Sequence, residues 1–225
     1  MKTTIGILCN DRKKLAECFF SSHENSIYTS VILAFDAKSA AEGLNKMLRT
    51  AEREGSDAII LIHQDVILFS NWQRYIEEQL EKLENWGVAG VWGTDGLNMF
   101  GHIWDTRLDR PVQNGVTLPV EVHTLDEVCL IIKTGLGFEF DEELVGWHLY
   151  GAYASLWMRE KGYGVWVLDA PIVHKTNTSF DWEPDESFIL NWEFLTTKFP
   201  LDKVNSTVCD RDYMEASYGH RNIEF

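Results

Sequence analysis

The chain has 225 residues and a formal net charge of −15, with 45% apolar and 12% aromatic residues. This length and apolar content suffice for a substantial core, so we expect a single globular unit. The charge argues against nucleic acid as a partner, because such binding depends on clustered Lys and Arg that neutralise phosphates, and the sequence has no such cluster.

The sequence also lacks the patterns of secretion and membrane insertion. No apolar run approaches the length of a transmembrane segment, and the first residues do not resemble a signal peptide. The cysteines are scattered without zinc-ligand spacing, which favours reduced thiols: Cys9, Cys18, Cys129 and Cys209. We therefore expect a cytoplasmic protein, either free or peripheral at the inner face of the membrane.

Through the first 92 residues, apolar patterns predict strands that alternate with helices. Strands are expected at 3–8, 30–35, 58–62 and 88–92. Helices are expected at 13–20, 40–51 and 72–83, the last beginning at a capping box formed by Ser70 and Gln73. This order predicts a mostly parallel sheet with right-handed crossovers.

The second half has a less regular pattern. Residues 93–119 are rich in Gly, Asp, Asn and aromatics without a clear period, which predicts a long functional loop. Strands at 127–133 and 164–168 and a helix at 149–161 follow. Asp185 is expected to cap a final helix that ends before Pro200.

The third predicted strand ends abruptly in His63 and Asp65. Its apolar residues indicate a strand buried on both faces, and open α/β sheets bind ligands at the carboxyl ends of such strands. An anionic ligand at this edge needs a local cation, because the chain itself is acidic. The pattern therefore predicts a metal and nucleotide site, although Asp65 as a turn cap and His63 as an edge residue remain an alternative.

Six segments in this order resemble the nucleotide-sugar glycosyltransferases of family 2, and the resemblance covers roughly residues 3 to 180. The segments are Cys9–Asp11, Asp36–Lys46, Leu61–Val66, Val145–Tyr150, Arg159–Tyr163 and Asp169–His174. His63-Gln64-Asp65-Val66 is similar to the variant that a bacterial branch carries in place of Asp-x-Asp.

The resemblance implies an α/β fold of the GT-A type, with a mixed, mainly parallel sheet flanked by helices. It implies a Rossmann-like nucleotide-sugar-binding half at 1–92, an acceptor and catalytic half at 93–180, and a C-terminal helical extension at 181–225. The implied activity is metal-assisted transfer, with inversion, of a sugar from a UDP-, GDP- or dTDP-linked donor to a saccharide, a lipid-linked molecule or another hydroxyl acceptor. A catalytically impaired domain that binds a sugar nucleotide or another protein is the alternative.

The resemblance also implies site residues. Asp65 is the expected ligand of Mn²⁺ or Mg²⁺, His174 is a further metal contact, and His63 lies near the ribose. The remaining nucleotide contacts are Cys9, Asn10, Asp11, Asp36, Asn45 and Lys46, and the acceptor contacts are Trp104 and Trp147. Without the resemblance, Asp36 is an ordinary acid at a helix start, Asn45 is a solvent-facing amide, His174 is a polar residue at a strand exit, and the tryptophans belong to the core.

The sequence departs from the family at the general base. Relatives carry Tyr-Asp-x-Asp where this chain has Tyr150-Gly151-Ala152-Tyr153. A base typically contributes about 10²- to 10⁴-fold in rate. His148 is the first candidate to replace it and Asp126 is the second. Restoring the acid with Gly151→Asp is expected to recover part of the activity that a His148 variant loses.

Overall fold

The computed structural model describes residues 1–22, 30–106, 110–113, 116–176, 183–199, 204–209 and 214. Within these residues, the central sheet has seven strands in the order β2-β1-β3-β11-β5-β12-β9. Their bounds are β1 (Thr3–Cys9), β2 (Ser30–Phe35), β3 (Ala58–His63), β5 (Trp86–Gly90), β9 (Val120–Glu121), β11 (Cys129–Lys133) and β12 (Gly164–Val167). β1 is parallel to β2 and β3, whereas β11 lies antiparallel between β3 and β5. The sheet is therefore mixed, as predicted.

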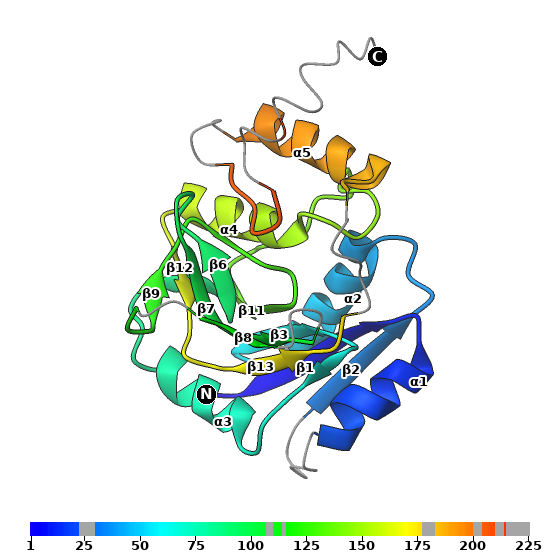
Figure 1. Ribbon diagram of the computed structural model, residues 1–225, viewed down its shortest axis with the longest axis vertical. Coiled ribbons are helices and arrows are strands. Elements are labelled where there is room, and N and C mark those ends of the chain that lie inside the picture. The colour runs from blue at the N-terminus through cyan, green and yellow to red at the C-terminus, as the bar shows by residue number, and fades with distance from the viewer. Residues whose placement is uncertain are drawn as a thin grey trace.

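Helices cover both faces of this sheet (Figure 1). One face carries α2 (Ala40–Arg53) and α4 (Tyr150–Glu160), with α5 (Glu186–Lys198) outside them. The other carries α3 (Trp72–Leu80) and α1 (Arg12–Leu15), which continues into the π-helical turn η1 (Ala16–Phe20). Successive side chains of β3 enter the two cores in turn, because strand residues alternate between faces. This two-sided burial explains the continuous apolar run before His63.

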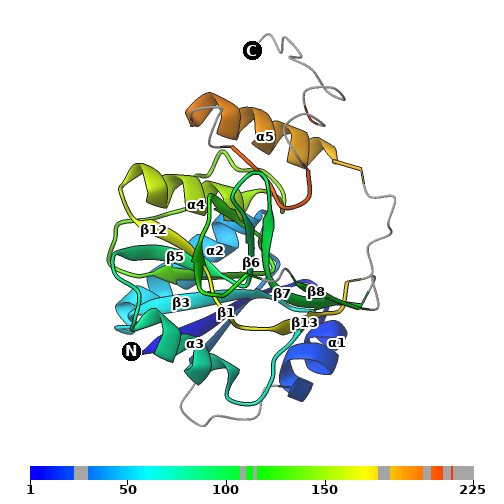
Figure 2. The same ribbon diagram turned by 60° about the vertical axis from the view of Figure 1, so that its left-hand side comes forward.

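A second sheet crosses the carboxyl edge of the first (Figure 2). Its order is β10 (Thr124–Leu125), β6 (Trp92–Thr94), β7 (Met99–Asp105), β13 (Ile172–His174) and β4 (Val66–Ile67), and β8 (Arg110–Gln113) pairs with β7. The prediction of a long loop at 93–119 was therefore wrong over most of the described part of that segment. The buried and exposed residues of β7 do not alternate strictly, and at Gly101, with φ +133°, a Cβ atom would lie 2.1 Å from the Val91 carbonyl oxygen.

The helix ends give one confirmed prediction and one error. Asp185 caps α5, since its side chain accepts a hydrogen bond from the Phe188 N–H at 2.8 Å. The capping box predicted for α3 does not form. That helix starts after Asn71, which has φ 61° and makes no side-chain cap, and Gln73 instead donates a hydrogen bond to the Thr3 hydroxyl at 2.6 Å.

Candidate functional site

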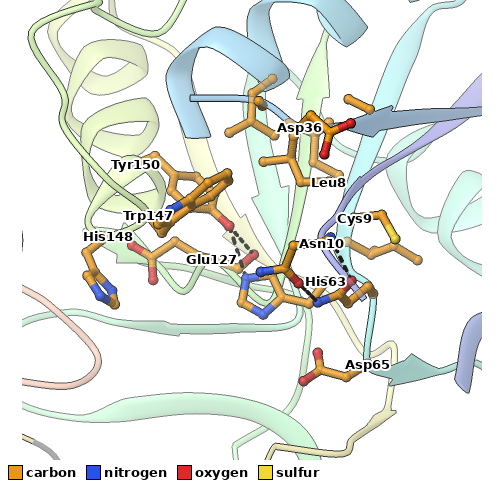
Figure 3. A pocket seen from close by; sticks show the side chains of 16 residues that line it. Leu8, Cys9, Asn10, Asp36, His63, Asp65, Glu127, Trp147, His148 and Tyr150 are labelled. Atoms are coloured by element: carbon orange, nitrogen blue, oxygen red, sulfur yellow. Dashed lines mark hydrogen bonds between the residues drawn. The ribbon is translucent and has the colours of Figure 1, made fainter. Parts of the chain in front are cut away.

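A cavity of about 380 Å³ opens where β1, β2 and β3 end (Figure 3). Its other side is formed by Glu127 and by residues at or just before the start of α4, namely Trp147, His148 and Tyr150. The site residues predicted from sequence that line it are Cys9, Asn10, Asp36, His63, Asp65, Trp147 and His148. The lining therefore combines both halves of the chain, and it lies at the sheet edge where the apolar run predicted a ligand.

Gln64 organises the turn after β1. Its side-chain oxygen accepts hydrogen bonds from the backbone N–H groups of Asn10 at 3.1 Å and Asp11 at 2.9 Å, and its amide donates to Asn10 Oδ1 at 2.5 Å. The Asp11 carboxylate accepts from the backbone N–H groups of Lys13 and Lys14, both at 3.0 Å, and so caps α1. Asp11 thus supports this turn and does not line the cavity.

His63, Asp65 and His174 form a cluster whose possible ligand atoms all lie within 4.8 Å of one another. The strand register creates it, because β13 pairs with β4 so that His174 lies opposite Val66, the residue after Asp65. His174 Nε2 is 3.5 Å from Asp65 Oδ1. His174 therefore joins the site through Asp65, although it does not line the cavity itself.

Asp65 and His63 have the protonation states that metal ligands need. Burial alone would raise the pKa of Asp65, but its hydrogen bond with His174 and the charges of its neighbours, Lys14 among them, lower it to about 2. Burial, together with the charge of His174, lowers the pKa of His63 to about 4. At neutral pH, Asp65 is an anion and His63 is a neutral imidazole, which are the forms that bind metals. Two imidazoles and a carboxylate suit Mn²⁺ better than Mg²⁺, which prefers oxygen ligands.

A second carboxylate stands behind His174. Asp105 is 8% exposed, lies opposite His174 in the pairing of β7 with β13, and places Oδ2 3.7 Å from His174 Nδ1. Carboxylates in this position orient imidazole ligands and fix their tautomer. The sequence analysis missed Asp105 because its strand lies in the segment predicted as a loop.

Glu127 is the acid that the sequence analysis did not single out. It lines the cavity, is half-buried, and interacts electrostatically with the backbone N–H groups of Leu149 and Gly151, at the start of α4. Burial, with the negative charge of Asp126, raises its pKa to about 8. Beside it, the Tyr150 hydroxyl lies 3.0 Å from His63 Nε2 and 3.4 Å from the Glu127 carbonyl oxygen.

This shift predicts a pH effect on stability. Because the folded pKa of Glu127 is above its ordinary 4.5, the fold binds the proton more tightly than the unfolded chain does. The contribution is complete below pH 4.5 and is lost as the pH rises through about 8. Wild type should therefore lose more free energy of unfolding than Glu127→Gln between pH 5 and 9. Urea titrations at both pH values measure this difference, and the exposed Glu142→Gln should follow wild type. Equal losses in wild type and Glu127→Gln would contradict the shift.

The two predicted candidates for the general base lie differently. Asp126 does not line the cavity, and its oxygens accept hydrogen bonds from the Val128 N–H at 2.9 Å and the Thr207 hydroxyl at 2.5 Å. His148 lines the cavity and places Nε2 3.3 Å from Asp185 Oδ2. His148 is thus within the site, whereas Asp126 supports the backbone beside it.

The other predicted contacts lie outside the cavity lining. Asn45 is buried and binds the backbone N–H and carbonyl of Phe140, both at 2.8 Å, so the alternative of a solvent-facing amide was wrong. Lys46 pairs with Glu42 on the surface of α2 at 2.7 Å. Trp104 is 42% exposed on β7, while Trp147, 45% exposed, lines the cavity.

Comparison with solved structures places the fold among the GT-A glycosyltransferases. GalNAc-T7 with UDP, GalNAc and Mn²⁺ matches with a TM-score of 0.54 and 10% identity, over 84% of this chain and 46% of that one. Residues 1–349 of S. aureus TarS with UDP-GlcNAc match with 0.53 and 13%, over 88% and 66%. The mannosyltransferase PcManGT from Pyrobaculum calidifontis with GDP-Man and Mn²⁺ matches with 0.53 and 10%, over 86% and 61%. The chain thus spans about half to two thirds of the length of these proteins, and the likeness at such identities shows the fold.

The sequence itself gives the family. The sequence model of the Glycosyltransferase like family matches residues 6–188, so the chain belongs to this family. A search of curated proteins finds no match. Within the described residues, no helix is long and apolar enough to cross a membrane.

Proposed function

We propose that the protein transfers a sugar, with inversion, from a nucleoside-diphosphate sugar to a saccharide, a lipid-linked molecule or another hydroxyl acceptor. The observation that carries the proposal is the convergence of His63, Asp65 and His174 beside the cavity at the end of β3. These three residues would hold Mn²⁺, or Mg²⁺ in its place. A divalent cation at this position would neutralise the charge that grows on the leaving diphosphate.

We assign the nucleotide and the acceptor to different sides of the cavity. We propose that residues 1–92 hold the nucleotide, through Cys9, Asn10 and Asp36 at the ends of β1 and β2. Residues 93–180 face the acceptor, and Trp147 offers an exposed aromatic plane that suits stacking on a sugar. Within the extension at 181–225, Asp185 supports this side, because it contacts His148. In this proposal Asp11 and Asn45 act by holding the walls of the site rather than by touching the ligand.

A thermal unfolding screen tests the function. UDP-GlcNAc, GDP-mannose and dTDP-glucose are each added with Mn²⁺ or with EDTA, and release of the nucleoside diphosphate is followed in parallel. A ligand of the native state adds about 2.7 kcal/mol of stability at one hundred times its Kd. We expect Mn²⁺-dependent stabilisation by one class of donor, with slow release of the diphosphate. Binding without any turnover would favour the alternative of a binding domain, and no binding would contradict both.

Asp105→Asn should weaken Mn²⁺-dependent donor binding by about 10- to 100-fold, the usual effect of losing an outer carboxylate. The asparagine keeps the shape of the buried side chain but cannot supply the negative charge that orients His174. Calorimetric titration with Mn²⁺ and the donor found in the screen measures the change. Affinity equal to that of wild type would show that Asp105 does not act on the metal site.

A further inference from the structure

Gly151 marks an unusually close approach between α4 and the segment before β11. A Cβ atom at this position would lie 2.6 Å from the Leu125 carbonyl oxygen and 3.3 Å from the Glu127 nitrogen. Distances below 3.0 Å do not occur for real side chains, so the backbone at 125–127 fills the space that a side chain at position 151 would need.

The same approach brings an acid into the cavity. Because residues 125–127 lie against the first turn of α4, the Glu127 carboxylate reaches the backbone N–H groups of Leu149 and Gly151. Figure 3 shows its side chain with Trp147, His148 and Tyr150, across from His63. The carboxylate thus lies on the side of the cavity that we assign to the acceptor.

The other acids in or beside the cavity make other contacts or lie on its nucleotide side. Of the residues that line the cavity, three carry carboxylates: Asp36, Asp65 and Glu127. Asp65 contacts His174 and Lys14, and Asp36 stands at the end of β2, on the nucleotide side. Asp126 is held by Val128 and Thr207 outside the lining. Glu127 is therefore the carboxylate of this lining placed to meet an acceptor hydroxyl.

We propose that Glu127 is the catalytic base of this glycosyltransferase, an inference that rests on the function proposed above. The acceptor hydroxyl gives its proton to the Glu127 carboxylate while its oxygen forms a bond to the anomeric carbon. The bond from that carbon to the diphosphate oxygen breaks, and the electron pair leaves with the diphosphate. The proton passes from Glu127 to solvent after the product departs. Glu127 thus supplies, from the turn before β11, the carboxylate that the helix lacks at Gly151.

The test compares two nucleophiles in Glu127→Gln, which keeps the shape of the side chain and its ability to accept from backbone N–H groups. The donor is UDP-GlcNAc or GDP-mannose, whichever stabilises wild type. With water as the acceptor, release of the nucleoside diphosphate should fall by about 10²-fold or more, while the donor Kd stays within about twofold of wild type. Azide carries no proton that must be removed, so formation of the glycosyl azide should continue at the rate of wild type. Glu142→Gln, at an exposed acid of the same region, should match wild type in both reactions.

Each other result overturns the inference in a recognisable way. Hydrolysis at the rate of wild type in Glu127→Gln would exclude Glu127 as the base. Parallel loss of hydrolysis and azide transfer would show that Glu127 positions the donor instead of taking a proton. If Glu127→Gln does not fold, Glu127→Asp provides the comparison, because a shortened carboxylate should slow hydrolysis and leave azide transfer unchanged. A wild-type protein that binds no donor would contradict the proposed function itself, before any variant is compared.

Discussion

Asp65→Asn is expected to abolish Mn²⁺-dependent binding of a nucleoside-diphosphate sugar without unfolding the protein. The carboxylate supplies the negative charge of the cluster, and the low pKa of about 2 shows that its surroundings already favour the anion. Asparagine keeps the size of the side chain, and the backbone hydrogen bond from Lys175 to the Asp65 carbonyl, at 2.9 Å, does not depend on it. The affinity for Mn²⁺ and donor should therefore fall by more than about 100-fold, the upper end of the effect of losing an outer carboxylate.

Calorimetric titration of Mn²⁺ and donor measures this loss, and a urea titration checks the fold. Asp169→Asn is a matched control, since Asp169 also contacts an imidazole, His102 Nδ1 at 3.1 Å, but does not line the cavity. His174→Ala should weaken binding less than Asp65→Asn, because a neutral imidazole adds no charge to the cation. Unchanged affinity in Asp65→Asn would remove the metal assignment, and a larger effect of His174→Ala would reverse the two roles.

The position of His63 and Asp65 could be predicted because it follows from local physics. A strand buried on both faces must be apolar throughout, so the first polar residues mark the point where it leaves the core. The resemblance to the family then indicated His174, which contacts Asp65 across the sheet edge. His174 reaches Asp65 through the pairing of β13 with β4, and both strands are short. The order of the segments along the chain therefore predicted most of the polar residues that line the cavity at the ends of β1, β2 and β3.

Glu127 and Asp105 could not be predicted in the same way, because their positions depend on pairing between distant segments. β11 enters the sheet antiparallel between β3 and β5, with Cys129 opposite Ile62, and this brings Glu127, two residues before Cys129, to the end of β3. The apolar pattern of a strand shows neither its direction in the sheet nor which strands lie beside it. Asn45 shows the same limit, since its buried amide binds Phe140, which lies 95 residues away in the sequence.

Gly151→Asp is expected to destabilise the protein and to lower its activity, although the resemblance to relatives with an acid at this position predicts that it recovers part of the activity that a His148 variant loses. The new Cβ would lie 2.6 Å from the Leu125 carbonyl oxygen, so the helix or the strand must shift. Forcing extra atoms into a packed interior typically costs about 1 to 3 kcal/mol. The aspartate would also bring a negative charge beside that carbonyl oxygen and the carboxylate of Glu127, which adds to the cost.

Gly151→Ala separates these two contributions, because it introduces the Cβ without the charge. Urea titration should show a lower free energy of unfolding for Gly151→Ala than for wild type, and a still lower value for Gly151→Asp. Donor hydrolysis should decrease in both, since any shift of residues 125–127 moves the Glu127 carboxylate away from the acceptor side of the cavity. A Gly151→Asp protein that is as stable as wild type and more active would show that this backbone yields easily. In that case the catalytic base of this fold would be assigned to position 151 and not to Glu127.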